Sequence, residues 1–99
     1  MPLDITEYNA LAADGAGRIV MAGQEPSIAS QQVAVGASST QSNPMGTTTR
    51  FVRLHSDVPC RIAVGVNPVA GPLSMRLAAN ATEYLGIAPN LRIAAIQTT

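Results

Sequence analysis

The fold is decided between residues 50 and 66, where the sequence reads RFVRLHSDVPCRIAVGV. In residues 50–56 the side chains alternate, and an extended chain would place Val52, Leu54 and Ser56 on one face. The opposite face of this segment would carry Phe51, Arg53 and His55. A period of two is that of a half-buried β-strand, so the segment predicts a strand.

A second strand follows after a break at Asp57-Val58-Pro59. One of its faces carries Cys60, Ile62, Val64 and Val66, and the other carries Arg61, Ala63 and Gly65. This is the clearest alternation in the chain, and it predicts a strand in the middle of a sheet.

Shorter strands separated by turns complete the second half of the chain. Asn67-Pro68 and Gly71-Pro72 mark a loop, because Asn accepts turn conformations and Pro lacks the N–H that a ladder needs. Further strands are expected at residues 74–78, 83–87 and 91–96, with turns at 80–82 and 89–90 between them. The last strand is almost continuously apolar, which predicts burial of both its faces.

The first half of the chain permits two interpretations. Asp4 followed by Glu7 resembles a capping box for a short helix over residues 5–13. The sequence Asp14-Gly15-Ala16-Gly17 equally suits a hairpin turn between two strands, and we favour strands or an extended arm. Downstream we expect a connection at residues 26–30, a strand at 31–35 and a polar loop at 36–46.

Seven or eight short strands without a long helix predict an all-β fold, an antiparallel β-sandwich of jelly-roll-like or immunoglobulin-like topology. The 99 residues have room for a single domain, residues 1–99, in which residues 1–30 form an N-terminal arm or a hairpin. Tyr8, Phe51 and Tyr84 are the only aromatic residues, so the core must be aliphatic. A domain of this size buries only about two-thirds of the surface of its unfolded chain, so association would stabilise it.

Charge is scarce and balanced in this chain. Six basic and six acidic residues make up 12% of it, about half of the usual fraction. A neutral, weakly charged surface indicates contact with partner subunits. Nucleic-acid binding is disfavoured, because there is no basic excess to neutralise phosphates. A signal-peptide pattern and an apolar run of about 18 residues are both missing, so no role in a membrane is expected.

The basic residues are all arginines, and there is no lysine. Arginine forms bidentate, partly desolvated pairs at subunit interfaces, where lysine serves poorly, but coding bias in a GC-rich genome explains the same composition. Several of the arginines lie on segments that otherwise read as apolar strands, where they either pair across an interface or face solvent. The candidates for interface roles are Arg53, Arg61 and Arg76.

Residues for catalysis are not assembled in any recognisable pattern. The single histidine, His55, has only Asp57 nearby in sequence, which is too little for a triad or a metal site. Cys60 is in phase with Ile62 and is expected to be a small buried residue; as the only cysteine it forms no internal disulfide. We therefore expect no catalytic, metal-binding or cofactor-binding residue, and the chain is not expected to be an enzyme.

Six segments together carry a family resemblance: TRFVRLHSD (49–57), CRIAVGVNP (60–68), MRLAAN (75–80), EYLGI (83–87), QEP (24–26) and QQVAVG (31–36). In these segments, from about residue 20 to the end, the chain resembles small virion proteins of tailed bacteriophages. Some related small β-sandwich proteins are capsid decoration, or cement, proteins. The shared motifs are strand and turn patterns, so no site residue carries over.

The resemblance implies a structural protein on the capsid surface, synthesised in the bacterial cytoplasm. It would decorate or cement the shell by bridging subunits of the major capsid protein, acting as a dimer or trimer. An alternative is a head-fibre or tail-associated β-sandwich that binds a host surface receptor or carbohydrate. Exposed aromatic rings, on which sugars stack, are few in this sequence.

Overall fold

The computed structural model describes residues 2–13, 16, 18–23, 25 and 27–98, with residues 11–13 and 19–22 described by their backbone alone. These residues form ten strands and no helix, and so no helix that could cross a membrane. The strands are β1 (Pro2–Tyr8), β2 (Leu11–Ala13), β3 (Ile19–Gly23), β4 (Ala29–Ala34), β5 (Thr40–Gln41), β6 (Phe51–Ser56), β7 (Cys60–Gly65), β8 (Met75–Leu77), β9 (Thr82–Gly86) and β10 (Arg92–Gln97).

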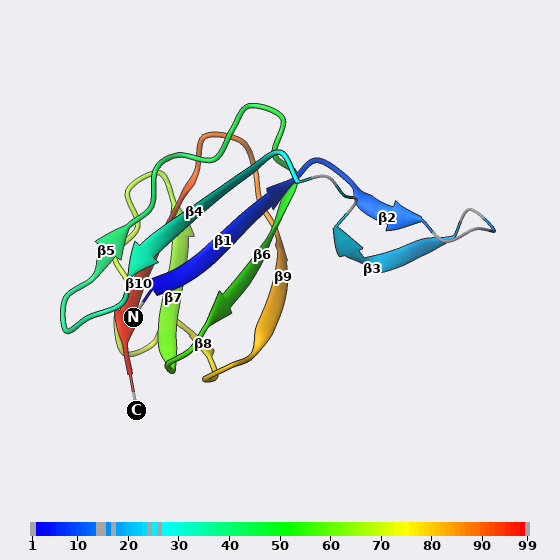
Figure 1. Ribbon diagram of the computed structural model, residues 1–99. Coiled ribbons are helices and arrows are strands. Elements are labelled where there is room, and N and C mark those ends of the chain that lie inside the picture. Colours follow the sequence, from blue (N-terminus) through cyan, green and yellow to red (C-terminus); the bar gives the residue numbers. More distant parts are fainter. Residues whose placement is uncertain (1, 14–15, 17, 24, 26, 99) are drawn as a thin grey trace.

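Eight of these strands form an antiparallel β-sandwich, as the sequence predicts (Figure 1). One sheet, here called the β1 sheet, has the order β4-β1-β6-β9. The other, the β7 sheet, has the order β5-β10-β7-β8. The two alternating segments within residues 50–66 form β6 and β7, and both are interior strands of their sheets.

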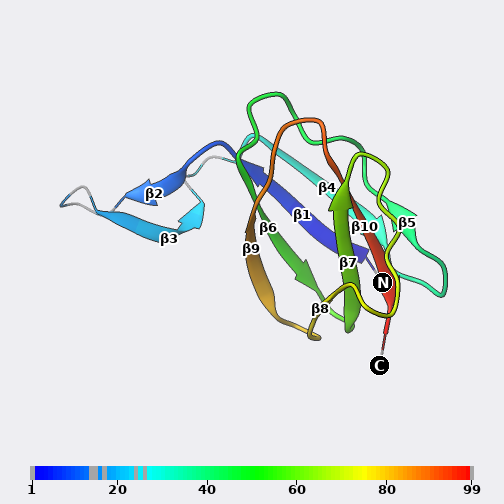
Figure 2. The same ribbon diagram turned by 180° about the vertical axis from the view of Figure 1, so that it is seen from behind.

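The chain winds through the sandwich as a jelly roll, one of the two predicted topologies. It crosses between the sheets at β4–β5, β5–β6 and β6–β7, and again at β8–β9 and β9–β10. Strand β1 lies between β4 and β6, the place that the last strand of an unpermuted jelly roll takes. β1 begins and β10 ends at the same end of the sandwich, as both views show (Figures 1 and 2).

The core between the sheets is aliphatic, as expected from the sequence. Within the described residues its buried cluster contains no aromatic side chain and consists of Leu3, Ile5, Val33, Val35, Met45, Val52, Leu54, Cys60, Ile62, Leu77, Ile87, Ile93 and Ala95. The alternation in β6 is confirmed, since Val52, Leu54 and Ser56 are all fully buried.

Of the four residues predicted to lie on the inner face of β7, two are buried. Cys60 and Ile62 are buried, whereas Val64 is 42% and Val66 77% exposed. The reason is the short neighbour β8, which pairs only as far as Ile62 and leaves the end of β7 uncovered on that side. The strand itself ends at Gly65, so Val66 belongs to the following loop.

Strand β10 is buried on both faces, as its apolar sequence predicts, and the β7–β8 loop provides the outer cover. Ile93 and Ala95 point into the core, while Ala94 lies on the outer face and is also fully buried. The loop, residues 66–74, folds back over this face with Pro68 and Ala70 buried. Gln41 Nε2 donates to Pro68 O at 2.9 Å, and Ala70 N donates to Ser39 Oγ at 2.9 Å.

The turns around β9 have the predicted chemistry. Asn80 and Asn90 adopt left-handed backbone conformations, with φ of 59° and 67°. Asparagine accepts this conformation more readily than most residues with a side chain.

The N-terminal region is built of strands, and the alternative helix over residues 5–13 is wrong. Residues 2–8 form β1, which pairs with β4 on one side and β6 on the other. The chain then leaves the sandwich as the β2–β3 hairpin, which projects from it in both views (Figures 1 and 2). Of its predicted turn, Asp14, Gly15 and Gly17 lie outside the described residues. The expected arm is therefore this hairpin, while β1 belongs to the sheet.

A buried carboxylate joins β1 to the loop between β5 and β6. Glu7 is only 4% exposed, and its Oε1 accepts hydrogen bonds from Gly46 N at 2.9 Å and from Thr49 Oγ1 at 2.7 Å. Thr49 is fully buried. Gln31 Nε2 on β4 makes a longer contact of 3.4 Å to the other carboxylate oxygen. Glu7 thereby holds this loop on the end of the sandwich.

We expect Glu7→Ala to lower the free energy of unfolding by about 2 to 4 kcal/mol, because it leaves the buried Thr49 hydroxyl and the partly buried Gly46 N–H without an acceptor. Urea unfolding followed by circular dichroism measures this loss. Glu83→Ala, at an exposed position of β9, is the matched control and should change stability by less than about 0.5 kcal/mol. Equal effects of the two substitutions would contradict the role given to Glu7.

Candidate functional site

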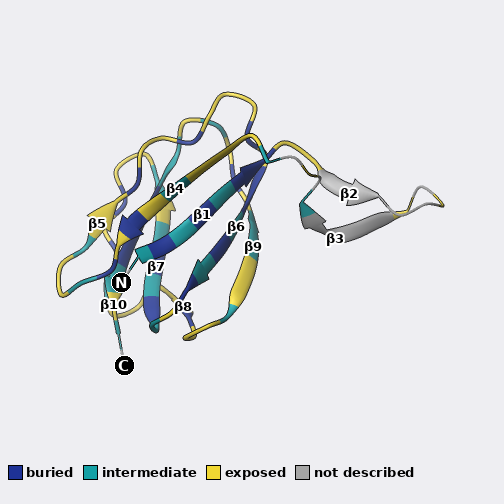
Figure 3. Cartoon of the chain, in the orientation of Figure 1, coloured by how far each residue is buried: buried dark blue, intermediate teal, exposed yellow. Residues whose placement is uncertain are grey.

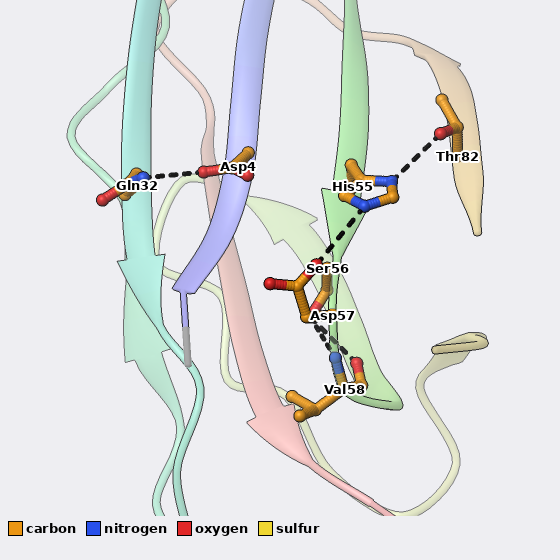
Figure 4. Close-up of polar contacts among 7 residues, drawn as sticks. All are labelled: Asp4, Gln32, His55, Ser56, Asp57, Val58 and Thr82. Atoms are coloured by element: carbon orange, nitrogen blue, oxygen red, sulfur yellow. Dashed lines mark hydrogen bonds and ion pairs between the residues drawn. The ribbon is translucent and has the colours of Figure 1, made fainter. Parts of the chain in front are cut away.

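The outer face of the β1 sheet carries a row of polar side chains that crosses all four strands. In the strand register Asp4 lies opposite Gln32 on one side and His55 on the other, and His55 lies opposite Thr82. Gln32 Nε2 donates to Asp4 Oδ1 at 2.8 Å, and His55 Nδ1 is 3.1 Å from Thr82 Oγ1 (Figure 4). We call Gln32, Asp4, His55 and Thr82 the polar belt. It gives this face hydrogen-bonding groups in a fixed order.

His55 is placed by surface contacts and lies apart from the only cysteine. Its Nε2 is 3.6 Å from Asp57 Oδ1, and the Asp57 side chain is 61% exposed (Figure 4). Ion pairs at such exposed positions contribute about 0–1 kcal/mol. Cys60 lies in the core with its side chain fully buried, and burial raises the pKa of its thiol. Because His55 is on an outer face, the two cannot act as a nucleophile and its base.

A shallow hollow lies next to the polar belt. Its volume is about 370 Å³, and Asp4, Thr6, Ser30, Gln32 and Arg53 contribute to its lining. Arg53 is half-buried and makes no ion pair with the residues that the structure describes. Figure 3 views this face directly, with exposed residues along β4 and β9 and more buried ones along β1 and β6. The hollow can accept a polar group of a partner molecule.

The three aromatic residues form a second row on the same face. Tyr8 stacks on Phe51 with ring centroids 5.4 Å apart, and Tyr84 follows at 6.2 Å from Phe51. Tyr8 is only 4% exposed and Phe51 only 7% exposed, while Tyr84 is half-buried.

The hairpin is attached at this aromatic row. Tyr8 donates its hydroxyl hydrogen to Glu25 Oε2 at 2.7 Å. A Cβ atom at Gly23 would lie 2.4 Å from the Tyr8 ring, so only glycine permits this approach at the end of β3. The root of the hairpin is therefore held against the sheet by Tyr8.

The three predicted interface arginines lie on opposite faces of the molecule. Arg53 is on the outer face of the β1 sheet, whereas Arg61 and Arg76 face each other across β7 and β8 on the outer face of the β7 sheet. Arg61 Nη1 donates to Ser74 O at 2.9 Å. The structure thus brings two of the three together.

The sequence analysis named Asp4 and Glu7 only as a possible capping box and did not predict that Gln32, Asp4, His55 and Thr82 form a polar belt. Their signal was present in the alternation of Leu3 and Ile5 with Asp4 and Thr6, which is typical of a strand. Among the described residues no group of three or more His, Cys, Asp and Glu side chains could hold a metal ion. The arrangement offers surfaces for binding, with hydrogen-bonding groups on one face and guanidinium groups on the other.

Searches against protein-family models, curated proteins and solved structures find no match to this chain. The two outer faces of the sandwich and the β2–β3 hairpin are therefore the candidate binding surfaces of the chain.

The contact with Glu25 and burial together raise the pKa of Tyr8 to about 12. The folded chain then keeps a proton that the unfolded chain releases at its ordinary pKa of about 10, so stability is full below pH 10 and falls as the pH rises towards 12. In a Tyr84→Phe variant, phenolate absorbance should appear near pH 12 while the protein is folded. The Tyr8→Phe variant, which keeps Tyr84, is the control and should lose this part of the alkaline stability change. Titration of Tyr8 near pH 10 in the folded protein would contradict the assignment.

Proposed function

We propose that this chain is a structural protein of a bacteriophage particle, which decorates or cements the capsid by bridging neighbouring subunits of the major capsid protein. The observation that carries this proposal is the β2–β3 hairpin, which leaves the sandwich (Figures 1 and 2). The molecule extends 45 Å along its longest axis against 26 and 20 Å along the others. A body with a projecting arm is suited to contact two subunits at once.

The composition of the hairpin supports contact with a partner. Its strands have the sequences LAA and IVMAG, without a charged or hydrogen-bonding side chain. A two-stranded hairpin alone in water is marginally stable, and its outer edges offer unpaired backbone groups. In the described part of the chain, β2 and β3 pair only with each other. A strand of a neighbouring subunit would satisfy these backbone groups, and an apolar surface beside it would suit the apolar sequence of both strands.

The sandwich does not depend on the hairpin for its own closure. Strands β1 and β4 pair directly from Pro2 and Ala34 to Glu7 and Ala29, and Ile28 N donates to Glu7 O at 2.9 Å. The arm therefore connects two strands that already lie side by side. We therefore expect the sandwich to fold without the hairpin, so that deletion of the hairpin tests docking alone.

Replacing residues 10–26 by a single glycine should leave a folded sandwich that no longer binds capsid shells. Circular dichroism and urea unfolding check the fold, and co-sedimentation with shells assembled without this protein checks binding. Wild-type protein should raise the temperature at which such shells disrupt, and the shortened variant should not. Glu83→Ala, distant in sequence from the arm, serves as the control that keeps binding. Wild-type protein that stays in the supernatant would refute the proposal.

We propose that the chain docks on the capsid as a homodimer or homotrimer. A small domain with an aliphatic core is modestly stable alone, and burial of apolar area contributes roughly 25 cal/mol per Å² in each contact. Light scattering of the purified protein measures the oligomeric state, for which a mass two or three times that of the chain is expected. A strictly monomeric protein would contradict this part of the proposal.

A second candidate function is binding of a host receptor or carbohydrate by a protein of the head fibre or tail. The outer face of the β1 sheet favours it, because Arg53 lines the hollow on one side and lies opposite the half-buried Tyr84 of β9 on the other. An aromatic ring beside polar groups is a common arrangement for sugars. Binding on a glycan array that Arg53→Ala and Tyr84→Ala abolish would establish this function. Absence of any glycan signal would leave capsid docking as the function.

A further inference from the structure

The charges of this neutral chain are divided unequally between its two sheets. The strands of the β7 sheet carry Arg61, Arg76 and Arg92 and no acidic residue, and the β7–β8 loop contains no acidic residue either. The strands of the β1 sheet carry three acidic residues, Asp4, Glu7 and Glu83, and one arginine, Arg53. The β7 sheet is therefore a positively charged side of a chain whose net charge is zero.

Two of these arginines lie directly opposite each other. Arg61 on β7 pairs in register with Arg76 on the edge strand β8. Their inner neighbours Cys60 and Leu77 are buried, so both arginines point to the outer face. Neither forms an ion pair with the residues that the structure describes. Like charges directly opposite on neighbouring strands disfavour the isolated sheet, whereas one carboxylate between them would be held by both guanidinium groups.

A loop with exposed apolar side chains lies beside this pair. The β7–β8 loop lies over the same face and exposes Val66 by 77%, Val69 by 73% and Leu73 by 98%. A cavity of about 270 Å³ lies between Arg61 and the loop, with Gly71, Pro72, Ile96 and Gln97 among its lining residues. Three of the six exposed large hydrophobic residues of the described chain, Val66, Val69 and Leu73, belong to this loop. An apolar surface around a cationic pair is typical of a protein interface.

We propose that Arg61, Arg76 and the exposed side chains of the β7–β8 loop form the surface that docks an acidic segment of a capsid subunit. The inference rests on the proposed function and adds the docking face and the chemistry of its partner. An aspartate or glutamate of that segment inserts between the two guanidinium groups, and apolar residues beside it cover Leu73 and Val69. Nucleic acid is a poorer fit, because it would need many phosphate contacts and would leave the apolar loop exposed to water.

The double variant Arg61→Gln/Arg76→Gln should bind capsid shells at least about tenfold more weakly than wild type, with most of the salt dependence lost. Arg50→Gln, which changes an exposed arginine just before β6 that belongs to neither candidate surface, is the matched control and should bind as wild type does. Co-sedimentation at several salt concentrations measures both. Unchanged binding of the double variant, with shells that retain wild-type protein, would overturn the inference and leave the proposed function standing. Failure of wild-type protein to bind shells would overturn the proposed function.

A second test does not need capsid shells. It compares binding of the protein to poly-L-glutamate, which offers carboxylates, with binding to duplex DNA, which offers phosphates. Wild-type protein and Arg50→Gln should be retained on immobilised poly-L-glutamate at low salt, and the double variant should not. Retention of all three proteins alike would overturn the carboxylate site. Stronger retention of wild-type protein on DNA would overturn the choice of a protein partner.

The Arg76→Glu variant separates stability from docking. It places opposite charges across β7 and β8, so the melting temperature of the isolated protein should rise while binding to poly-L-glutamate and to shells is lost. If Arg76 only stabilised the fold, its replacement would not raise the melting temperature while abolishing binding. A fall in melting temperature, or binding equal to that of wild type, would contradict the proposed surface.

Discussion

The pairing of β1 with strands on both of its sides organises this molecule. Its inner face contributes Leu3 and Ile5 to the core and Glu7 to the loop contact at the end of the sandwich. Its outer face contributes Asp4 to the polar belt and Tyr8 to the root of the hairpin. Because side chains alternate along a strand, one seven-residue segment serves core, loop, surface and arm together. A shift of the register by one residue would exchange all of these roles.

The strands of the second half could be predicted because their information is local. In residues 50–66 the alternation of apolar and polar side chains indicates both the strand and its inner face, and Pro and Asn mark the turns. Residues 2–8 carry the same alternation, but the spacing of Asp4 and Glu7 also fits a helix start, so local rules compete there. The pairing of β1 with two strands distant in sequence resolves the competition in favour of a strand.

The sites depend on contacts that local patterns do not contain. Glu7 and its partner Thr49 are far apart in sequence, and nothing in the residues around either one indicates the other. Arg61 and Arg76 were recognised separately as candidates for interfaces, but their juxtaposition follows from the β7–β8 register, which a long loop does not specify. Composition likewise reports a net charge of zero and hides the division of charge between the sheets. The residue types of the proposed docking surface could be named from the sequence, whereas their arrangement required the fold.

The hairpin and the arginine pair are both unfavourable in the isolated chain, and composition does not explain either one. Coding bias accounts for arginine in place of lysine, but it does not place two arginines opposite each other or extend an apolar hairpin away from the core. Both features disfavour the isolated chain, one through the repulsion of like charges and the other through the unpaired backbone groups at the edges of a two-stranded hairpin. In the proposed assembly both would be relieved by contact with a surface that offers carboxylates and a strand edge. The proposed role in an assembly rests on these two features of an otherwise regular sandwich.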